Sequence, residues 1–308
     1  MREYAVQCME QLNDDSLLDY LLQLIQVLKY EPYHDSALAR YLLRRALLNR
    51  RIGHSFFWYL KSEMHVPVIS ERYGLLLEAY LRGCGTHRLE LQKQISTLKD
   101  FVRIANQIKT MKDGDRKDCL QAELRKIQFP IKLQLPLNPS MEVNGVVVEK
   151  CKYMDSKKLP LWIVLKNADA NVESTKSVIF KSGDDLRQDM LTLQMIRLMD
   201  KFWKQEGLNL ELSPYGCIAT GNDEGMIEVV LGADTMANIT KNAGGAKAAL
   251  FREDPLANWI RGHNPKDESY AKAVDNFTLS CAGYCVATYV LGIGDRHNDN
   301  VSKERKIS

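Results

Sequence analysis

The stretch Gly-Ile-Gly-Asp-Arg-His-Asn-Asp-Asn, residues 292–300, is the most informative part of this sequence of 308 residues. It follows an apolar run and places Asn300 five residues after Asp295. In phosphoryl-transfer enzymes, a catalytic loop of this spacing uses the Asp to orient or deprotonate the attacking hydroxyl and the Asn to hold a magnesium ion. The order Asp-Arg-His at 295–297 reverses the His-Arg-Asp of protein kinases and argues against that class. The alternative is a polar turn after a buried helix.

Composition indicates a globular chain with enough apolar residues to build cores, since 45% of its residues are hydrophobic. The net charge of +3 is too small to indicate a nucleic-acid partner. Seven cysteines without a Cys-x-x-Cys pair favour reduced thiols and an intracellular protein. Residues 1–20 show no signal-peptide pattern, and the apolar run at 286–293 is too short to span a bilayer. We therefore expect a cytoplasmic protein whose membrane contact is peripheral.

Residues 1–128 have the periodicity of consecutive helices. Apolar residues recur at three- and four-residue steps, as in the series Leu17, Leu21, Leu24, Ile25 and Leu28. Asp14 or Asp15 is the candidate cap of this helix. We predict antiparallel helix pairs stacked as a solenoid, followed by a long helix over about 89–127 that breaks near Gly114.

At residue 129 the pattern changes to short strands. The strand-like runs lie at 146–148, 162–165, 177–180, 218–220 and 226–230, with a helical pattern at 186–203. From Asp234 onward, the chain is expected to be mostly helical again. The predicted fold class is therefore α+β: a helical-repeat domain, then a kinase-like catalytic domain of two lobes with ATP between them.

Lys181 ends an apolar strand, and Asp189 lies eight residues later, early in the next helix. A kinase needs a strand lysine that neutralises nucleotide phosphates and a helix carboxylate that holds this lysine. The alternative is a pair of solvated surface charges, and the spacing alone favours it.

Two further segments are weaker candidates for nucleotide contacts. The turn at 154–160 offers backbone N–H groups, a hydroxyl and ammonium groups to phosphates, but it matches neither a Gly-x-Gly-x-x-Gly nor a Walker loop. The strand end at 228–230 could present backbone groups to an adenine, or it could be a buried strand end. Cys281 and Cys285 have i,i+4 spacing, but the small residues around them favour close helix packing over metal binding.

Several segments together make the sequence similar to phosphatidylinositol 3-kinases. They are Phe-Lys-Ser-Gly-Asp-Asp-Leu-Arg-Gln-Asp at 180–189, Cys-Ala-Gly-Tyr-Cys at 281–285, and the loop at 292–300. The Pro-Tyr-Gly-Cys segment at 214–217 resembles the class I catalytic subunits most, and 150–157 leans toward the beta/delta type. Segments 28–32 and 51–54 resemble the end of that family's helical domain. The resemblance covers essentially residues 1–301.

The resemblance implies contacts to the ATP phosphates and to the inner part of the nucleotide pocket. Ser156 and Lys158 would lie in the phosphate-binding loop, and Lys181 would contact the phosphates. Asp189 and Tyr215 would line the inner pocket.

The resemblance also implies an adenine site and a catalytic loop. The adenine would meet the backbone of Glu228, Val229 and Val230 and pack against Trp162, Ile179 and Ile227. Asp295, Arg296 and His297 would form the catalytic group, with His297 handling the proton. Asn300 would bind Mg²⁺.

The implied domain order is the end of a helical accessory domain with linker helices at 1–128, an ATP-binding lobe at 129–230 and a partial second lobe at 231–308. After Asn300 the family continues with Ile-Met and then Asp-Phe-Gly, whereas this chain has Val301-Ser302 and no Asp-Phe-Gly. We therefore interpret the sequence as a fragment truncated at both ends. We expect it to have little or no lipid kinase activity alone, because one metal-binding carboxylate is missing.

The parent reaction would transfer the ATP γ-phosphoryl group to the inositol 3-hydroxyl of phosphoinositide lipids, after peripheral recruitment to the plasma membrane. An SH2-type regulatory subunit is a further implied partner of the full-length protein, and nucleic acid is not. Two alternatives stay open. One is a non-catalytic binding or scaffold protein that uses the helical domain, and the other is a different lipid kinase of the superfamily, such as a class III enzyme or a 4-kinase.

Overall fold

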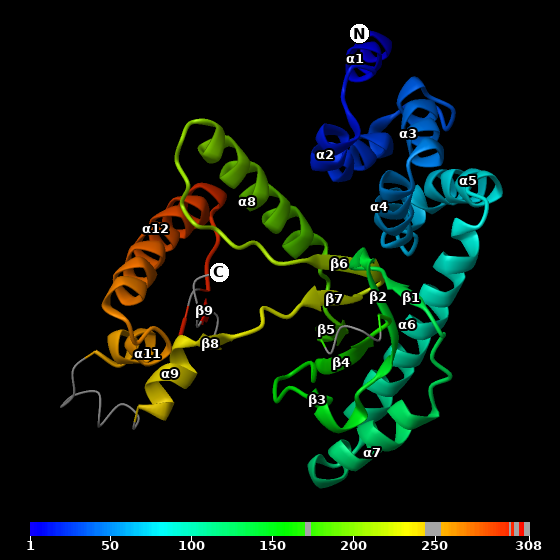
Figure 1. Cartoon of the computed structure of the whole chain (residues 1–308). Coiled ribbons are helices and arrows are strands. Elements are labelled where there is room, and N and C mark those ends of the chain that lie inside the picture. Colours follow the sequence, from blue (N-terminus) through cyan, green and yellow to red (C-terminus); the bar gives the residue numbers. More distant parts are fainter. Residues whose placement is uncertain (170–173, 244–253, 296, 299–301, 305–308) are drawn as a thin grey trace. The chain divides into compact units, whose positions relative to one another are not determined.

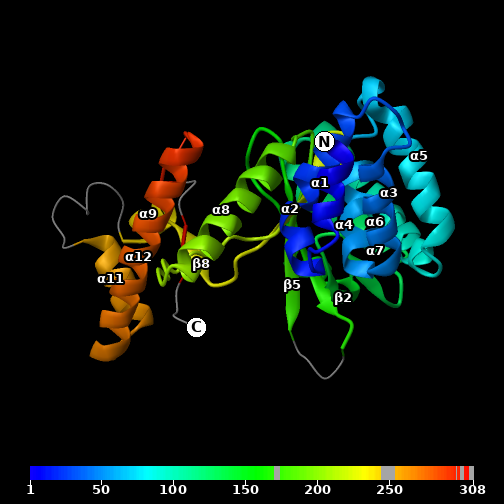
Figure 2. The same cartoon turned by 90° about the horizontal axis from the view of Figure 1, so that it is seen from above.

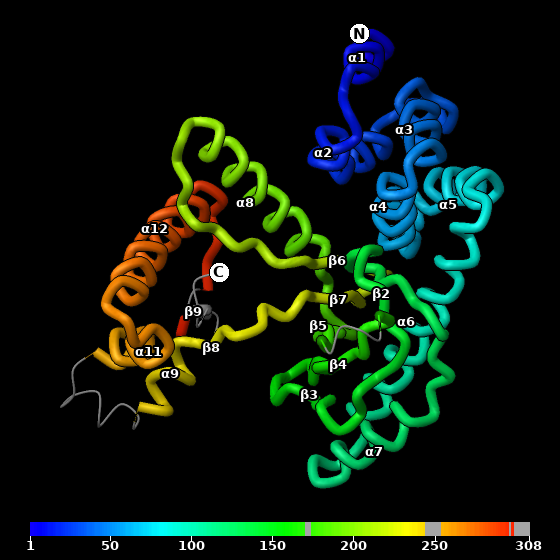
Figure 3. Tube along the Cα trace, viewed as in Figure 1, coloured from blue at the N-terminus to red at the C-terminus, as the bar shows by residue number. Residues whose placement is uncertain are grey.

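The computed structural model describes residues 1–169, 174–243, 254–295, 297–298 and 302–304. The chain folds into two compact units. The first comprises Met1–Leu191 and Gly216–Val229, and the second comprises Thr192–Tyr215 and Val230–Ser308. Figure 1 labels the elements and Figure 3 traces the chain, which passes between the units within helix α8 (Arg187–Gln205) and again near residues 215 and 229.

Helices fill the first 126 residues of the first unit, as the periodicity predicts. They are α1 (Arg2–Met9), α2 (Asp14–Val27), the 3₁₀ turn η1 (Leu28–Tyr30), α3 (Ala37–Leu48), α4 (Arg50–Lys61), α5 (Pro67–Gly83), α6 (His87–Thr110) and α7 (Asp113–Lys126). Figure 2 shows these helices gathered on one side of strands β2 and β5. Helix α4 contacts α2, α3 and α5, so its aromatic residues Phe56, Phe57 and Trp58 are almost completely buried. The core of this helical layer is therefore built around α4.

One predicted helix cap is wrong, and the predicted break of the long helix lies close to its expected position. The cap of α2 is Asn13, whose side-chain oxygen accepts the Ser16 amide at 2.8 Å, and not Asp14 or Asp15, which lie in the first turn. The long helix breaks at residues 111–112, where both residues have extended backbone, and Gly114 lies inside α7. Local sequence pointed to the glycine, but the backbone can leave the helix at any residue where tertiary contacts favour the turn.

A seven-stranded antiparallel sheet completes the first unit. Its strands are β1 (Leu133–Leu135), β2 (Asn138–Val146), β3 (Lys152–Tyr153), β4 (Leu161–Asn167), β5 (Thr175–Ser182), β6 (Cys217–Gly221) and β7 (Glu224–Glu228). They pair in the order β1-β2-β4-β5-β7-β6, with β3 also on β4. The predicted strand at 146–148 is wrong beyond Val146, because the chain turns into the 3₁₀ helix η2 (Val148–Lys150). One sheet face packs on α6, where the rings of Phe101 and Phe180 lie 5.7 Å apart.

The described part of the second unit is mostly helical, as predicted. It contains the end of α8, α9 (Met236–Asn242), α11 (Pro255–His263) and α12 (Asp267–Leu291), with a short ladder of β8 (Ala233–Thr235) and β9 (Ser302–Glu304) that the sequence did not predict. Its core joins Ile196, Leu212 and Ala287. A Cβ on Gly283 would lie 2.8 Å from Leu212 Cδ2, so the prediction that small residues allow close packing of α12 is confirmed. Within the described ranges, no helix combines the length and the apolar character needed to cross a bilayer.

Candidate nucleotide and catalytic sites

One face of the sheet carries the three apolar residues predicted to pack on adenine. Trp162 on β4 lies opposite Ile179 on β5, and Ile179 lies opposite Ile227 on β7. Residues directly opposite each other in a sheet point to the same face, so the three side chains form one row. All three are partly exposed, whereas the flanking Val178 and Phe180 are buried on the other face. The row is an apolar surface on which a planar base could stack.

Lys181 lies two residues after Ile179 on β5, and therefore on the same face as the apolar row. Its Nζ is 2.7 Å from Asp184 Oδ2. The predicted partner Asp189 is thus not the ion-pair partner of this lysine. Desolvation raises the pKa of Asp189, the charge of Lys181 opposes the rise, and the charge of Asp184 adds to it. The sequence prediction followed helix position and missed Asp184, although an i,i+3 spacing from Lys181 was visible.

Two further lysines lie near the end of β5. The turn that carries the exposed Ser156 and Lys158 is closed by a hydrogen bond from the Leu159 amide to the Ser156 carbonyl, at 3.0 Å. A Cβ placed on Gly183 would lie 4.0 Å from Lys158 Nζ and 3.3 Å from Lys109 Nζ. Burial, and then the positive charge of Lys158, lowers the pKa of Lys109. No local pattern pointed to Lys109, because this residue belongs to α6, more than 70 residues before Gly183.

The end of β7 is held firmly within the first unit. The Glu228 amide donates to the Gly216 carbonyl at 2.8 Å, and Glu228 Oε2 accepts the Gly216 amide at 2.7 Å. The Val229 amide donates to the Ser177 carbonyl at 3.3 Å, and Val229 is buried. Of the three residues predicted to present backbone to adenine, Glu228 and Val229 therefore both have their amides committed to hydrogen bonds within the first unit.

Tyr215 and Val230 belong to the second unit. Tyr215 is exposed, and its carbonyl accepts a hydrogen bond from Arg197 Nη2 on α8 at 2.5 Å. The predicted roles of Tyr215 and Val230 in the nucleotide pocket stay predictions.

The loop after α12 brings two of the predicted catalytic residues together. Gly292 ends the helix in the left-handed conformation at φ 65°, and the Ile293 amide donates to the Thr288 carbonyl at 2.9 Å. Asp295 also has a positive φ of 54°, a conformation that Asp adopts more readily than most residues. His297 Nε2 lies 3.8 Å from Asp295 Oδ1, and both side chains are exposed. An exposed carboxylate beside an imidazole can accept and pass on a proton.

The other end of this loop is tied to the second unit by its backbone. The Asn298 carbonyl accepts the Ala237 amide at 3.0 Å. Arg296 and Asn300 lie outside the described residues, so their predicted catalytic and magnesium-binding roles stay predictions.

Phosphoryl-transfer enzymes use the two features described above. One is an apolar row that ends in a lysine–carboxylate pair, and the other is a separate loop with an Asp–His pair after a long helix. Comparison with known families agrees with this class. Residues 1–93 match the accessory domain (PIK domain) of the phosphoinositide 3-kinase family, and residues 175–302 match phosphatidylinositol 3- and 4-kinases. The chain belongs to the phosphoinositide 3-kinase family.

Three curated relatives from Dictyostelium discoideum match almost the whole chain. Phosphatidylinositol 3-kinase 1 is 61% identical over 301 residues, covering 98% of this chain and 19% of that protein. Phosphatidylinositol 3-kinase 2 is 56% identical over 303 residues, covering 98% and 16%, and phosphatidylinositol 3-kinase 3 is 46% identical over 304 residues, covering 98% and 18%. The chain therefore spans less than a fifth of the length of these relatives. The predicted family and fold class are confirmed, and the leaning toward class I and the beta/delta type stays a prediction.

Proposed function

We propose that this chain provides the ATP site and part of the catalytic loop of a phosphatidylinositol 3-kinase. The reaction is transfer of the ATP γ-phosphoryl group to the 3-hydroxyl of phosphoinositide lipids at a membrane surface. The observation that supports it most is the apolar row Trp162–Ile179–Ile227 with Lys181 beyond it on the same face. A base on the row places its phosphates toward the lysines at the end of β5.

Each group has a chemical task in this proposal. Lys181, Lys158 and Lys109 offset the negative charge of the triphosphate. His297, beside Asp295, takes the proton of the inositol hydroxyl. The hydroxyl oxygen forms a bond to the γ-phosphorus, while the bond from the γ-phosphorus to the β,γ-bridging oxygen breaks. Carboxylate and amide oxygens such as those of Asp295 and Asn300 are the donors that Mg²⁺ prefers, and the bound ion would offset charge on the phosphoryl oxygens.

Nucleotide binding by the 308-residue chain is the first test, because it requires no turnover. ATP and adenosine affinities are measured by calorimetry for the wild type and for Lys181→Met. We expect ATP affinity to fall about tenfold or more, the equivalent of 1.4 kcal/mol, and adenosine affinity to stay unchanged because adenosine carries no phosphate. The control is Lys99→Met, an exposed lysine of α6. An equal loss for both ligands would show that Lys181 does not act on phosphates.

The position of transfer is the second test. The longest polypeptide that contains this sequence is incubated with Mg-ATP and phosphatidylinositol vesicles, and the product is separated by the position of its new phosphate. We expect the wild type to form the 3-phosphorylated lipid and the Asp295→Asn variant to form none. A 4-phosphate would refute the 3-kinase proposal, and ATP binding without any product would favour the non-catalytic alternative.

A further inference from the structure

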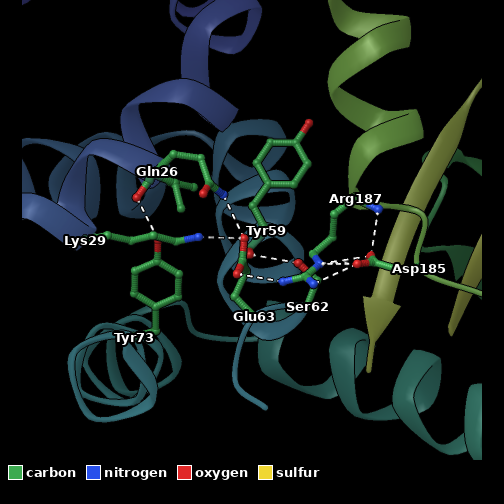
Figure 4. Close-up of polar contacts among 9 residues, drawn as sticks. Gln26, Lys29, Tyr59, Ser62, Glu63, Tyr73, Asp185 and Arg187 are labelled. Atoms are coloured by element: carbon green, nitrogen blue, oxygen red, sulfur yellow. Dashed lines mark hydrogen bonds and ion pairs between the residues drawn. The ribbon is translucent and has the colours of Figure 1, made fainter. Parts of the chain in front are cut away.

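A buried carboxylate of the helical layer reaches the start of α8. Glu63 follows α4, its side chain is only 6% exposed, and both of its oxygens are engaged (Figure 4). Oε1 accepts from Gln26 Nε2 at 2.9 Å and from Lys29 Nζ at 3.0 Å, and Oε2 accepts from Arg187 Nη1 at 3.0 Å. Burial alone would raise the pKa of Glu63, but these hydrogen bonds and charges outweigh it and lower the pKa. The carboxylate therefore stays ionised in the interior.

Arg187 joins this carboxylate to a second one. Its Nε and Nη2 donate to the two oxygens of Asp185 at 2.9 and 2.7 Å, in the fork geometry that suits arginine (Figure 4). Asp185 Oδ1 also accepts the Arg187 backbone amide at 3.1 Å, which satisfies an unpaired donor at the start of α8. The guanidinium is thus fixed between Asp185 and Glu63, although Glu63 and Arg187 are 124 residues apart.

The segment just before α8 is held from two more sides. The amides of Gly183 and Asp184 both donate to the Asp223 carbonyl, at 2.6 and 2.9 Å. Lys109 Nζ donates to the Ser182 carbonyl at 2.7 Å. These contacts come from the β6–β7 turn and from the helical layer. The segment contains Asp184, the ion-pair partner of Lys181, and it leads into α8, which carries Asp189.

A buried ion pair is a weak source of stability, because desolvation of the charges offsets much of their attraction. The contact instead restricts orientation, because a guanidinium that binds two carboxylates can adopt few positions. We propose that Glu63 is a positioning residue: through Arg187 it sets the start of α8, and with it the arrangement of Asp184 and Asp189 around Lys181. The accessory helical domain thereby tunes how the site holds the phosphates of ATP. This inference rests on the proposed ATP site.

The test replaces the carboxylate without changing its size. In Glu63→Gln of the 308-residue chain we expect ATP affinity to fall about tenfold, adenosine affinity to stay constant, and amide hydrogen exchange over 183–195 to rise. Arg187→Lys keeps the charge but loses the fork, and it should change the same three readouts in the same direction. This second variant decides the matter if Glu63→Gln does not fold.

Glu123 provides a matched control. Its side chain is 9% exposed and binds Arg103 at 2.6 Å and Lys126 at 2.5 Å, so it too is a mostly covered carboxylate that is paired with two cations. Its two cationic partners lie on α6 and α7 and not on the segment before α8. Glu123→Gln should lower thermal stability and leave ATP affinity and exchange over 183–195 unchanged.

The possible outcomes separate the two proposals. The inference is overturned if Glu63→Gln lowers stability as Glu123→Gln does but leaves ATP affinity and exchange over 183–195 as in the wild type. If the wild type does not bind ATP, the proposed function fails. The exchange comparison then still decides whether Glu63 orders the start of α8.

Discussion

Acidification from pH 7 to pH 5 should destabilise the first unit through two buried histidines. His54 donates from Nε2 to the Pro136 carbonyl at 2.8 Å, and His87 Nδ1 lies 2.7 Å from the Tyr80 hydroxyl. The two rings are 5.9 Å apart, and the residues are 3% and 4% exposed. Burial lowers the pKa of each histidine to about 4, and for His87 the proximity of His54 adds to the effect.

Stability falls on acidification because the unfolded chain binds protons at a higher pH than the folded chain does. The unfolded chain protonates each histidine near pH 6.5, whereas the folded chain keeps it neutral until about pH 4. Stability is therefore present above pH 6.5 and is lost as the pH falls toward 4. The difference between the two pKa values corresponds to a contribution of about 3 kcal/mol per histidine to the free energy of unfolding. About 2 kcal/mol of this contribution is lost by pH 5. The pair should thus cost about 4 kcal/mol at pH 5, a large part of a typical domain's stability of roughly 5–15 kcal/mol.

The assay is urea unfolding at pH 7 and pH 5, followed by the fluorescence of tryptophan, including the buried Trp58 on the same helix as His54. The double variant His54→Gln/His87→Gln should lose most of the pH dependence, and His34→Gln, at an exposed position, should retain it. A carboxylate whose pKa is lowered on folding acts below this pH window. Glu123, whose side-chain hydrogen bonds lower its pKa to about 2, loses stabilisation only below its unfolded pKa near 4.5. Equal unfolding midpoints at pH 7 and 5 in the wild type would refute the reasoning, as would an unchanged pH dependence in the double variant.

Two further predictions concern packing and the nucleotide site. Gly53→Ala should destabilise by about 2 kcal/mol or more, because the new Cβ would lie 2.6 Å from the Ala46 carbonyl oxygen, which is backbone and cannot move aside. Gly74→Ala, whose Cβ would have no neighbour nearer than 3.5 Å, should instead stabilise α5 by up to about 1 kcal/mol, so thermal melts of the two variants should shift in opposite directions. Asp189→Asn should keep or raise the melting temperature at pH 7, because desolvation raises the pKa of this carboxyl and so disfavours its charge. A fall in melting temperature would show instead that Asp189 stabilises the fold as an anion.

The helices and most strands could be predicted from the sequence because their signals are local. Leu17, Leu21 and Leu28 repeat with the helical period because hydrogen bonds within a helix join residues four apart and one face is buried. The motif at 292–300 depends on neighbours within nine residues. The error at residues 147–148 and the small shift of the helix break to residues 111–112 fall at element ends, where local preference is weak and packing decides.

The sequence by itself therefore determined the family, the order of helices and strands, and the residue types of the candidate site. Only the tertiary structure decided which charges meet: Lys181 with Asp184, Lys109 beside Gly183, and Glu63 with Arg187. The reason is physical. Lys109 and Gly183 are 74 positions apart, and Glu63 and Arg187 are 124 apart, so these two contacts depend on how the helices pack against the sheet. For Lys181 the local spacing offered both Asp184 and Asp189, and only the folded turn decided between them.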